Sequence, residues 1–151
     1  MTENRDELLE HYRHTRDALL AAIDGLTDAE LSESSIDGWS VKDHLAHLAV
    51  WDDVRAAEVE RISAGHDSAW RMRDEQDDAY NLMSYELRKS MSAAQAKWEL
   101  AQSRMRLLDA IAGATERGLD ASLYGDAGLR SGHEEEHTAW IKRWRSEREG
   151  S

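Results

Sequence analysis

The stretch GWSVKDHLAHLAVW, residues 38–51, has the pattern of the start of a long amphipathic helix and decides the fold class. Ser40 can accept a hydrogen bond from an early backbone N–H, as an N-cap does, and Asp43 suits the positive end of the helix dipole. Apolar residues recur at helical spacing, at Val41, Leu45, Leu48, Val59 and Ile62. We therefore predict a helix from Ser40 to about Ala64, ended by Gly65.

Three further long helices are predicted by the same periodicity, over residues 3–24, over 92–112, and from a start between 129 and 133 to about 148. A shorter helical segment over 75–89 is an insertion between the second and third long helices. The chain has no proline to interrupt these helices, and no segment has the pattern of a strand. Residues 1–151 are therefore predicted to form one all-α domain, a four-helix bundle.

The apolar stripes of the last two long helices predict which faces are buried. On the helix over 92–112 the stripe consists of Ala94, Trp98, Ala101, Met105, Leu108 and Ala112. On the last helix it consists of Leu129, His133, His137, Trp140 and Trp144.

The composition excludes several classes of protein. The net charge of -12 disfavours binding to nucleic acid and to anionic membrane surfaces, because both repel an acidic protein. No cysteine is present, so disulfides, thiolate ligands and thiol nucleophiles are excluded. No apolar run is long enough to cross a bilayer, and the first residues lack a secretory signal. We expect a cytoplasmic protein.

Two of the seven histidines, His133 and His137, are spaced to bind the same metal ion. Residues four apart lie on adjacent turns of one helix face, here among expected core residues. Buried imidazoles are costly unless their nitrogens are satisfied, and a metal ion would satisfy one nitrogen of each ring. A hydrogen-bonded pair at the end of a bundle explains the same spacing equally well.

A third ligand would have to come from another helix, and periodicity leaves two choices for it. His44 lies nearer the centre of the apolar stripe of its helix, whereas His47 lies on its flank beside Trp51. The helical wheel by itself slightly favours His44. The remaining histidines, at positions 11, 14 and 66, are expected on a solvated or partly covered helix face or in a loop.

Two segments of the chain resemble the DinB-like superfamily, close to its DfsB/ClbS-like branch. The stretch 38–51 is similar to the family's W-S-v-x-d-x-l-a-H-L segment, whose last histidine is a metal ligand and corresponds to His47. HEEEHTAWI, residues 133–141, is similar to its H-x-x-x-H segment, which supplies the other two ligands. The resemblance therefore selects His47 over His44 as the partner of His133 and His137.

The resemblance also implies a fold, an assembly and a cofactor. It implies an up-down-down-up four-helix bundle, frequent homodimers, and one divalent metal ion held by three histidines, with water in the open positions. Neutral imidazoles suit zinc, nickel or iron, and affinity order alone does not choose among them.

Residues Trp39, Trp51, Tyr80, Asn81 and Tyr85 are candidates to line a substrate pocket near the ion. For the tryptophans and Tyr80, however, a role as core or dimer contacts is the favoured interpretation. The three glutamates at 134–136 adjoin the predicted ligands. Glu136 could orient a histidine or act as a base, but a solvated acidic face near the helix start is the favoured interpretation.

Three functions are compatible with such a site. The first is a metal-dependent enzyme, a thiol transferase or a hydrolase, that acts on a small reactive metabolite. The second is a stress or resistance protein that binds and sequesters a metabolite without turnover. The third is a helical scaffold whose histidines are structural.

Overall fold

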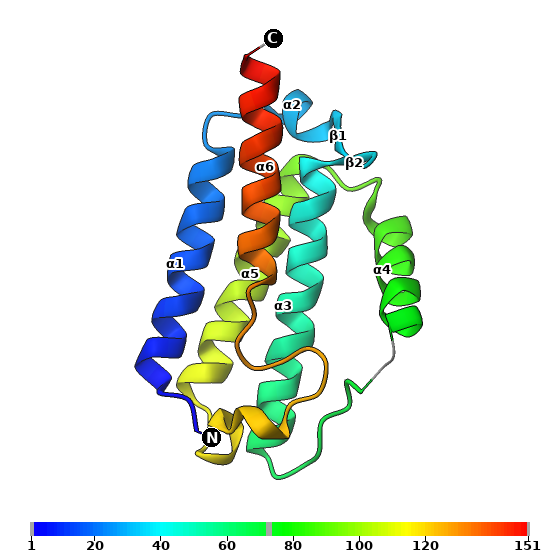
Figure 1. Cartoon of the computed structure of the whole chain (residues 1–151). Coiled ribbons are helices and arrows are strands. Elements are labelled where there is room, and N and C mark those ends of the chain that lie inside the picture. Colours follow the sequence, from blue (N-terminus) through cyan, green and yellow to red (C-terminus); the bar gives the residue numbers. More distant parts are fainter. Residues whose placement is uncertain (1, 72–73, 151) are drawn as a thin grey trace.

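The computed structural model describes residues 2–71 and 74–150, which form a helical bundle with one helix outside it (Figure 1). Among these residues the helices are α1 (Arg5–Ile23), α2 (Asp28–Ser32), α3 (Val41–Ser63), α4 (Asp74–Arg88), α5 (Ala93–Ala112) and α6 (His133–Glu149). Two short 3-10 turns, η1 (Arg117–Leu119) and η2 (Ala121–Leu123), interrupt the connection from α5 to α6. The prediction of an all-α four-helix bundle is confirmed.

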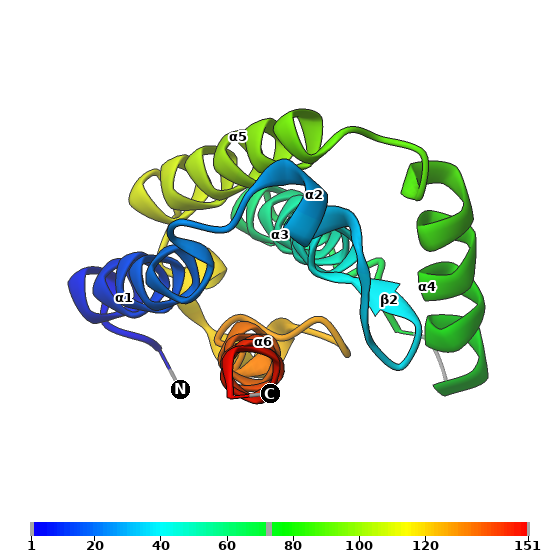
Figure 2. The same ribbon diagram turned by 90° about the horizontal axis from the view of Figure 1, so that it is seen from above.

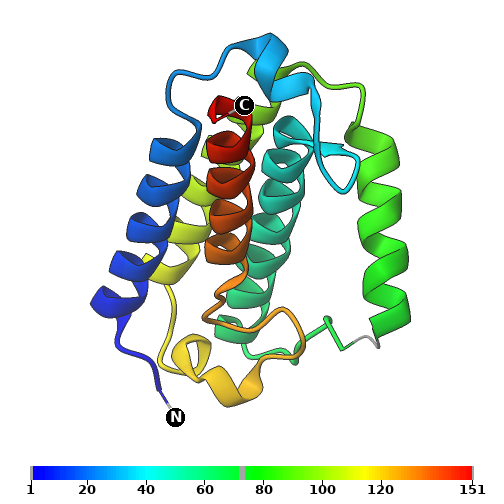
Figure 3. The same ribbon diagram turned by 45° about the horizontal axis from the view of Figure 1, so that its top comes forward.

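The four long helices run up, down, down and up in chain order (Figure 1). Because α3 and α5 run in the same direction, the chain must return to the top of the bundle between them. The inserted helix α4 makes that return, and it lies outside the bundle on the side of α3 (Figures 2 and 3). The predicted helical insertion is confirmed within one residue at each end.

The helix starts follow the sequence signals. Ser40 caps α3: its hydroxyl accepts from the backbone N–H of Asp43, whose carboxylate in turn accepts from the backbone N–H of Ser40. The hydroxyl of Ser92 caps α5 by accepting from the backbone N–H of Gln95. The last helix begins at His133, later than the earliest predicted start at Leu129, with Gly132 as its N-cap.

A short hairpin precedes α3, although no strand was expected from the sequence. Strands β1 (Ser34–Ile36) and β2 (Trp39–Ser40) pair antiparallel, with Ile36 opposite Trp39. Asp37 and Gly38 both have positive φ, 51° and 86°. That combination is typical of a two-residue hairpin turn, for which Asp-Gly is a strong sequence signal. The strands were missed because each is too short to show an alternating pattern.

The buried face of α5 differs from the predicted stripe. The helix buries Ala93, Ala96, Leu100, Ser103, Arg104, Leu107 and Ile111. Trp98 and Met105, which were expected in the core, are 62% and 57% exposed. The buried face follows a second apolar stripe at helical spacing, Ala93, Ala96, Leu100, Leu107 and Ile111, and Arg104 on that face pairs with acidic residues of two other helices.

Those charged groups form a buried ionic cluster of Arg16, Asp52, Arg104 and Glu134, one from each long helix. Arg104 binds both oxygens of Asp52 at 3.0 Å, and Arg16 binds both oxygens of Glu134 at 3.0 and 3.1 Å. Two further contacts, at 2.9 and 2.7 Å, join the two pairs into one group. The cluster is neutral overall, so its burial leaves no unpaired charge.

The ionic cluster divides the apolar core into two parts. On one side lie Leu8, Tyr12, Val59, Ile62, Leu107, Ile111 and Leu129. On the other side lie Leu19, Ile23, Leu31, Val41, Leu45, Leu48, Leu100 and Ile141. The cluster therefore ties all four helices together at the middle of the bundle.

Substituting Asp52 should destabilise the fold strongly. Asp52→Asn leaves two buried guanidinium groups with a single carboxylate, and breaking a buried ion pair in this way costs about 3–5 kcal/mol. Urea denaturation should show a correspondingly lower free energy of unfolding. The matched control is Asp53→Asn, because the Asp53 side chain is 52% exposed and 3.7 Å from Arg106. This control should lose less than about 1 kcal/mol; equal losses in the two variants would contradict a structural role for the cluster.

Candidate metal centre

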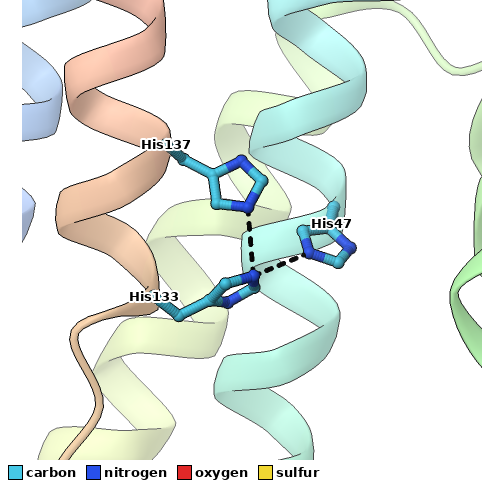
Figure 4. Close-up of side chains that lie close together, drawn as sticks. All are labelled: His47, His133 and His137. Carbon is cyan, nitrogen blue, oxygen red and sulfur yellow. Dashed lines mark hydrogen bonds between the residues drawn. The ribbon is translucent and has the colours of Figure 1, made fainter. Parts of the chain in front are cut away.

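Three histidine side chains from two helices converge on one point between α3 and α6 (Figure 4). His133 and His137 lie on successive turns of α6, and His47 faces them from α3. Nε2 of His133 is 3.1 Å from Nε2 of His47 and 3.0 Å from Nε2 of His137. One nitrogen of each ring lies within 4.8 Å of the others. Helical spacing accounts for the pair on α6, and only the packing of α3 against α6 adds the third ring.

Burial keeps these imidazoles neutral. Loss of solvation, with a smaller contribution from neighbouring histidines, lowers the pKa of His47 to about 3 and that of His137 to about 2. Burial also lowers the pKa of His133. Since each ring has lost its charge at neutral pH, each carries a lone pair on one nitrogen, which is the form that binds a metal.

The arrangement fits a divalent ion better than it fits a set of hydrogen bonds. A neutral imidazole has one donor and one acceptor, so a single Nε2 on His133 cannot satisfy two facing Nε2 atoms equally. An ion bound at about 2.0–2.1 Å holds neighbouring ligand nitrogens roughly 3.0–3.4 Å apart, depending on geometry. The two separations from Nε2 of His133, 3.1 and 3.0 Å, lie in that range, and all three nitrogens lie within 4.8 Å of one another. His47, His133 and His137 could therefore hold one ion.

His44 is buried beside the cluster but outside it. Its side chain is only 4% exposed, and its Nδ1 is 2.8 Å from Nδ1 of His137, on the far side of that ring. Both histidines that periodicity left open on α3 are thus buried, and only His47 presents a nitrogen to the three-ring group. His11, His14 and His66 lie elsewhere; Nε2 of His11 is 2.9 Å from the backbone carbonyl of Ser131.

The hairpin before α3 places Trp39 against the cluster. The Trp39 ring lies 5.5 Å from the ring of His47 and 5.3 Å from that of His44. Tyr85 of α4 stacks on Trp39, with the ring planes 6° apart and the centroids at 5.0 Å. The Asp37–Gly38 turn is therefore what brings the first aromatic candidate residue to the site.

The inserted helix α4 covers the adjoining side of the cluster. Trp51 donates from Nε1 to the side-chain oxygen of Asn81 at 2.8 Å, and its ring contacts that of Tyr80 edge to face. Trp51 also lies 6.5 Å from the His133 ring. The structure thus brings all five predicted pocket residues to one side of the cluster.

Trp70 belongs to the same aromatic group and was not singled out from the sequence. Its ring contacts Trp51 at 5.3 Å and Tyr80 at 4.9 Å. It precedes α4 in an irregular segment, where no periodicity could have indicated its contacts.

The pocket beside His47 is small, with a volume of about 10 Å³. Trp39, Asn81, Tyr85 and Arg88 are among the residues that line it. That volume is about the space of a single water molecule. With α4 in this position, aromatic side chains cover the cluster on the side of His47, whereas His133 stays partly exposed.

The expectation of a solvated face for all three glutamates is wrong for Glu134. Its side chain is buried in the ionic cluster, whereas Glu135 and Glu136 are exposed. The physical reason is charge pairing, because Arg16 and Arg104 supply the donors that make burial of a carboxylate tolerable. Glu134 thereby anchors the first turn of α6, which carries His133. Trp140, expected in the core, is 36% exposed.

No helix in residues 2–71 and 74–150 is long and apolar enough to span a membrane.

The fold and the three-histidine group together define a helical bundle with a candidate metal centre between its second and last long helices. A family model described as the DinB superfamily matches residues 11–141. The chain therefore belongs to the DinB superfamily. No curated protein matches it.

A solved structure shares the fold. It is described as a crystal structure of an uncharacterised protein from Escherichia coli UTI89, with a TM-score of 0.76 and 14% sequence identity. The match covers 96% of this chain and 94% of that one. Assignment to the DfsB/ClbS-like branch stays a prediction.

The metal-free protein should lose stability as the pH falls below about 6.5. The unfolded chain takes up protons on its histidines near their ordinary pKa, whereas burial holds the pKa of folded His47 near 3. The unfolded state therefore binds more protons in this window, and the free energy of unfolding decreases by up to about 1.4 kcal/mol per pH unit for each such histidine. Urea denaturation at pH 7, 6 and 5 measures this slope.

Two variants identify the source of that slope. His47→Leu should flatten it, because one of the buried imidazoles is removed. His66→Asn should leave it unchanged, because His66 is exposed and outside the cluster. Equal slopes in the wild-type protein and His47→Leu would contradict the assignment.

Proposed function

We propose that the protein is a metal-dependent enzyme in which His47, His133 and His137 bind one divalent ion through their Nε2 atoms. The observation that carries the proposal is the convergence of three neutral imidazoles at separations that suit a shared ion. No carboxylate joins the group among the residues that the structure describes. Three protein ligands leave coordination positions for a substrate, as in catalytic rather than structural metal sites. Zinc, nickel and iron all suit this donor set.

The reaction we propose is thiol transfer to, or hydrolysis of, a small reactive metabolite. When bound, the ion would supply Lewis acidity to a substrate oxygen or acidify a water. The protein supplies the rest: the aromatic rings of Trp39, Trp51 and Tyr85 exclude bulk water and offer apolar surface to the substrate. Asn81, held by Trp51, is a polar group on the pocket wall that can orient a substrate.

A second candidate function is sequestration of a metabolite without turnover. It is favoured by the cover over His47, because the pocket of about 10 Å³ beside that residue admits no metabolite while α4 is in place. A metabolite that enters on the side of His47 must displace α4, and slow return of that helix would trap it. Product formation distinguishes the enzyme from the binding protein.

We also propose that the protein forms a homodimer, as its resemblance to the family implies. Support comes from the large apolar side chains on the outer faces of α1 and α5: Leu20 is 46%, Trp98 62% and Met105 57% exposed. Light scattering after size-exclusion chromatography measures the mass in solution.

Removing one ligand should abolish metal binding. His137→Ala leaves two nitrogens, and we expect it to lower zinc affinity by more than about 100-fold and to remove turnover. Native mass spectrometry and elemental analysis should find one ion per wild-type chain. His66→Ala is the control, because that residue is exposed and outside the cluster. Full activity of a metal-free preparation would contradict the proposal.

Loosening α4 should open the site. Asn81→Ala removes the hydrogen bond from Trp51, a loss of about 1 kcal/mol, so amide exchange over residues 74–88 should become about fivefold faster. Leu82→Ala is the control, since the neighbouring Leu82 is 61% exposed. Hydrogen–deuterium exchange measured by mass spectrometry compares the two. Equal exchange in both variants would show that Asn81 does not hold the cover.

A further inference from the structure

His44 lies directly behind His137, on the side away from the three converging nitrogens. Its Nδ1 is 2.8 Å from Nδ1 of His137, and the two ring centroids are 5.0 Å apart. The other nitrogen of His137, Nε2, is 3.0 Å from Nε2 of His133. His44 therefore contacts the back of one member of the cluster and does not belong to the cluster itself.

The contact between the two Nδ1 atoms links the tautomers of the two rings. A hydrogen bond there holds one proton, which belongs either to His137 or to His44. If His137 carries the proton, its Nε2 presents a lone pair to the cluster. If His44 carries it, His137 accepts at Nδ1 and its own proton sits on Nε2, where it blocks metal binding. Only the first arrangement makes His137 a ligand.

We propose that His44 is a positioning residue that accepts the Nδ1–H of His137. It would thereby hold the orientation of that ring and select the tautomer in which Nε2 is free for the ion. The inference rests on the proposed function, since it assumes that the cluster binds a metal. Ligating histidines generally donate their second N–H to a carboxylate, a carbonyl or a water. In this protein an imidazole takes that place.

The surroundings of His44 support a role beyond packing. The side chain is 4% exposed, and its Nε2 is buried with no hydrogen-bond partner among the residues that the structure describes. Either tautomer leaves that atom unsatisfied, so an apolar side chain would fill the same space at lower cost. Its Nδ1 faces His137 alone in the hydrogen-bond network of those residues. The polar contact to His137 is what a histidine adds at this position.

The matched substitutions are His44→Phe and His44→Gln. Phenylalanine keeps a ring in the space but cannot accept a hydrogen bond, whereas the glutamine side-chain oxygen can. We expect His44→Phe to weaken zinc binding by about 10- to 100-fold, as loss of such partners generally does, and His44→Gln to recover most of that loss. Competition with a chromophoric chelator measures the dissociation constants.

A packing control comes from the same core. Ile141→Val removes one methylene from a fully buried residue of α6, one turn beyond His137. It should leave the dissociation constant of zinc within about twofold of the wild-type value, because no polar contact changes. Comparable weakening in Ile141→Val and His44→Phe would assign the effect to packing and overturn the proposal.

The tautomer itself is a second readout, and it needs no substitution. Long-range ¹H–¹⁵N spectra of the zinc-loaded wild-type protein distinguish protonated from metal-bound imidazole nitrogens. We expect His137 to be protonated at Nδ1 and bound to zinc at Nε2, with His44 protonated at Nε2. A His137 bound through Nδ1, or a His44 protonated at Nδ1, would overturn the proposal even if His44→Phe failed to fold.

The outcomes separate this inference from the proposed function. Absence of zinc uptake by the wild-type protein would refute both. Zinc uptake that is abolished by His137→Ala but unchanged by His44→Phe would keep the metal site and refute the role of His44. Weakening by His44→Phe, with recovery by His44→Gln and the expected tautomers, would support both.

Discussion

The buried ionic cluster of Arg16, Asp52, Arg104 and Glu134 is the constraint on which the rest of the structure depends. Two bidentate pairs are satisfied only when all four long helices are aligned at one level, because their donors and acceptors have fixed directions. A slip of any helix by one turn would leave a buried charge unpaired, at a cost that apolar packing alone would not impose. The cluster therefore determines helix register, while the apolar groups on either side of it supply the driving force for burial.

That register positions the histidines. Glu134 is bound to two arginines immediately after His133, and Asp52 lies five residues beyond His47 on the facing helix. Since both anchors belong to one ionic group, α3 and α6 are held at the height at which their imidazoles meet. The carboxylates of the ionic cluster are paired with arginines, and burial keeps the neighbouring imidazoles of His47 and His137 neutral. A group held in this way would need little rearrangement to hold an ion.

The inserted helix α4 both returns the chain to the top of the bundle and covers part of the candidate site. Two parallel neighbouring helices require a return connection, and α4 makes that return along the outer side of α3. Its inner face meets Trp39 and Trp51, which flank the histidine cluster. A connection that the bundle needs in any case thus covers one side of the candidate centre. Access on that side depends on the contacts of one outer helix and not on the packing of the core.

The sequence by itself determined the helices, the caps at Ser40 and Ser92, and the spacing of His133 and His137, because these depend on residues within one or two turns of each other. Likeness to the family, not periodicity, selected His47 over His44. Only the tertiary structure decided that both are buried and that His44 contacts the back of His137. It also decided that Glu134 is buried and that α5 turns Arg104 inward, away from its predicted apolar face. These features depend on pairing between charges on different helices, and a local pattern carries no information about a partner up to 118 residues away.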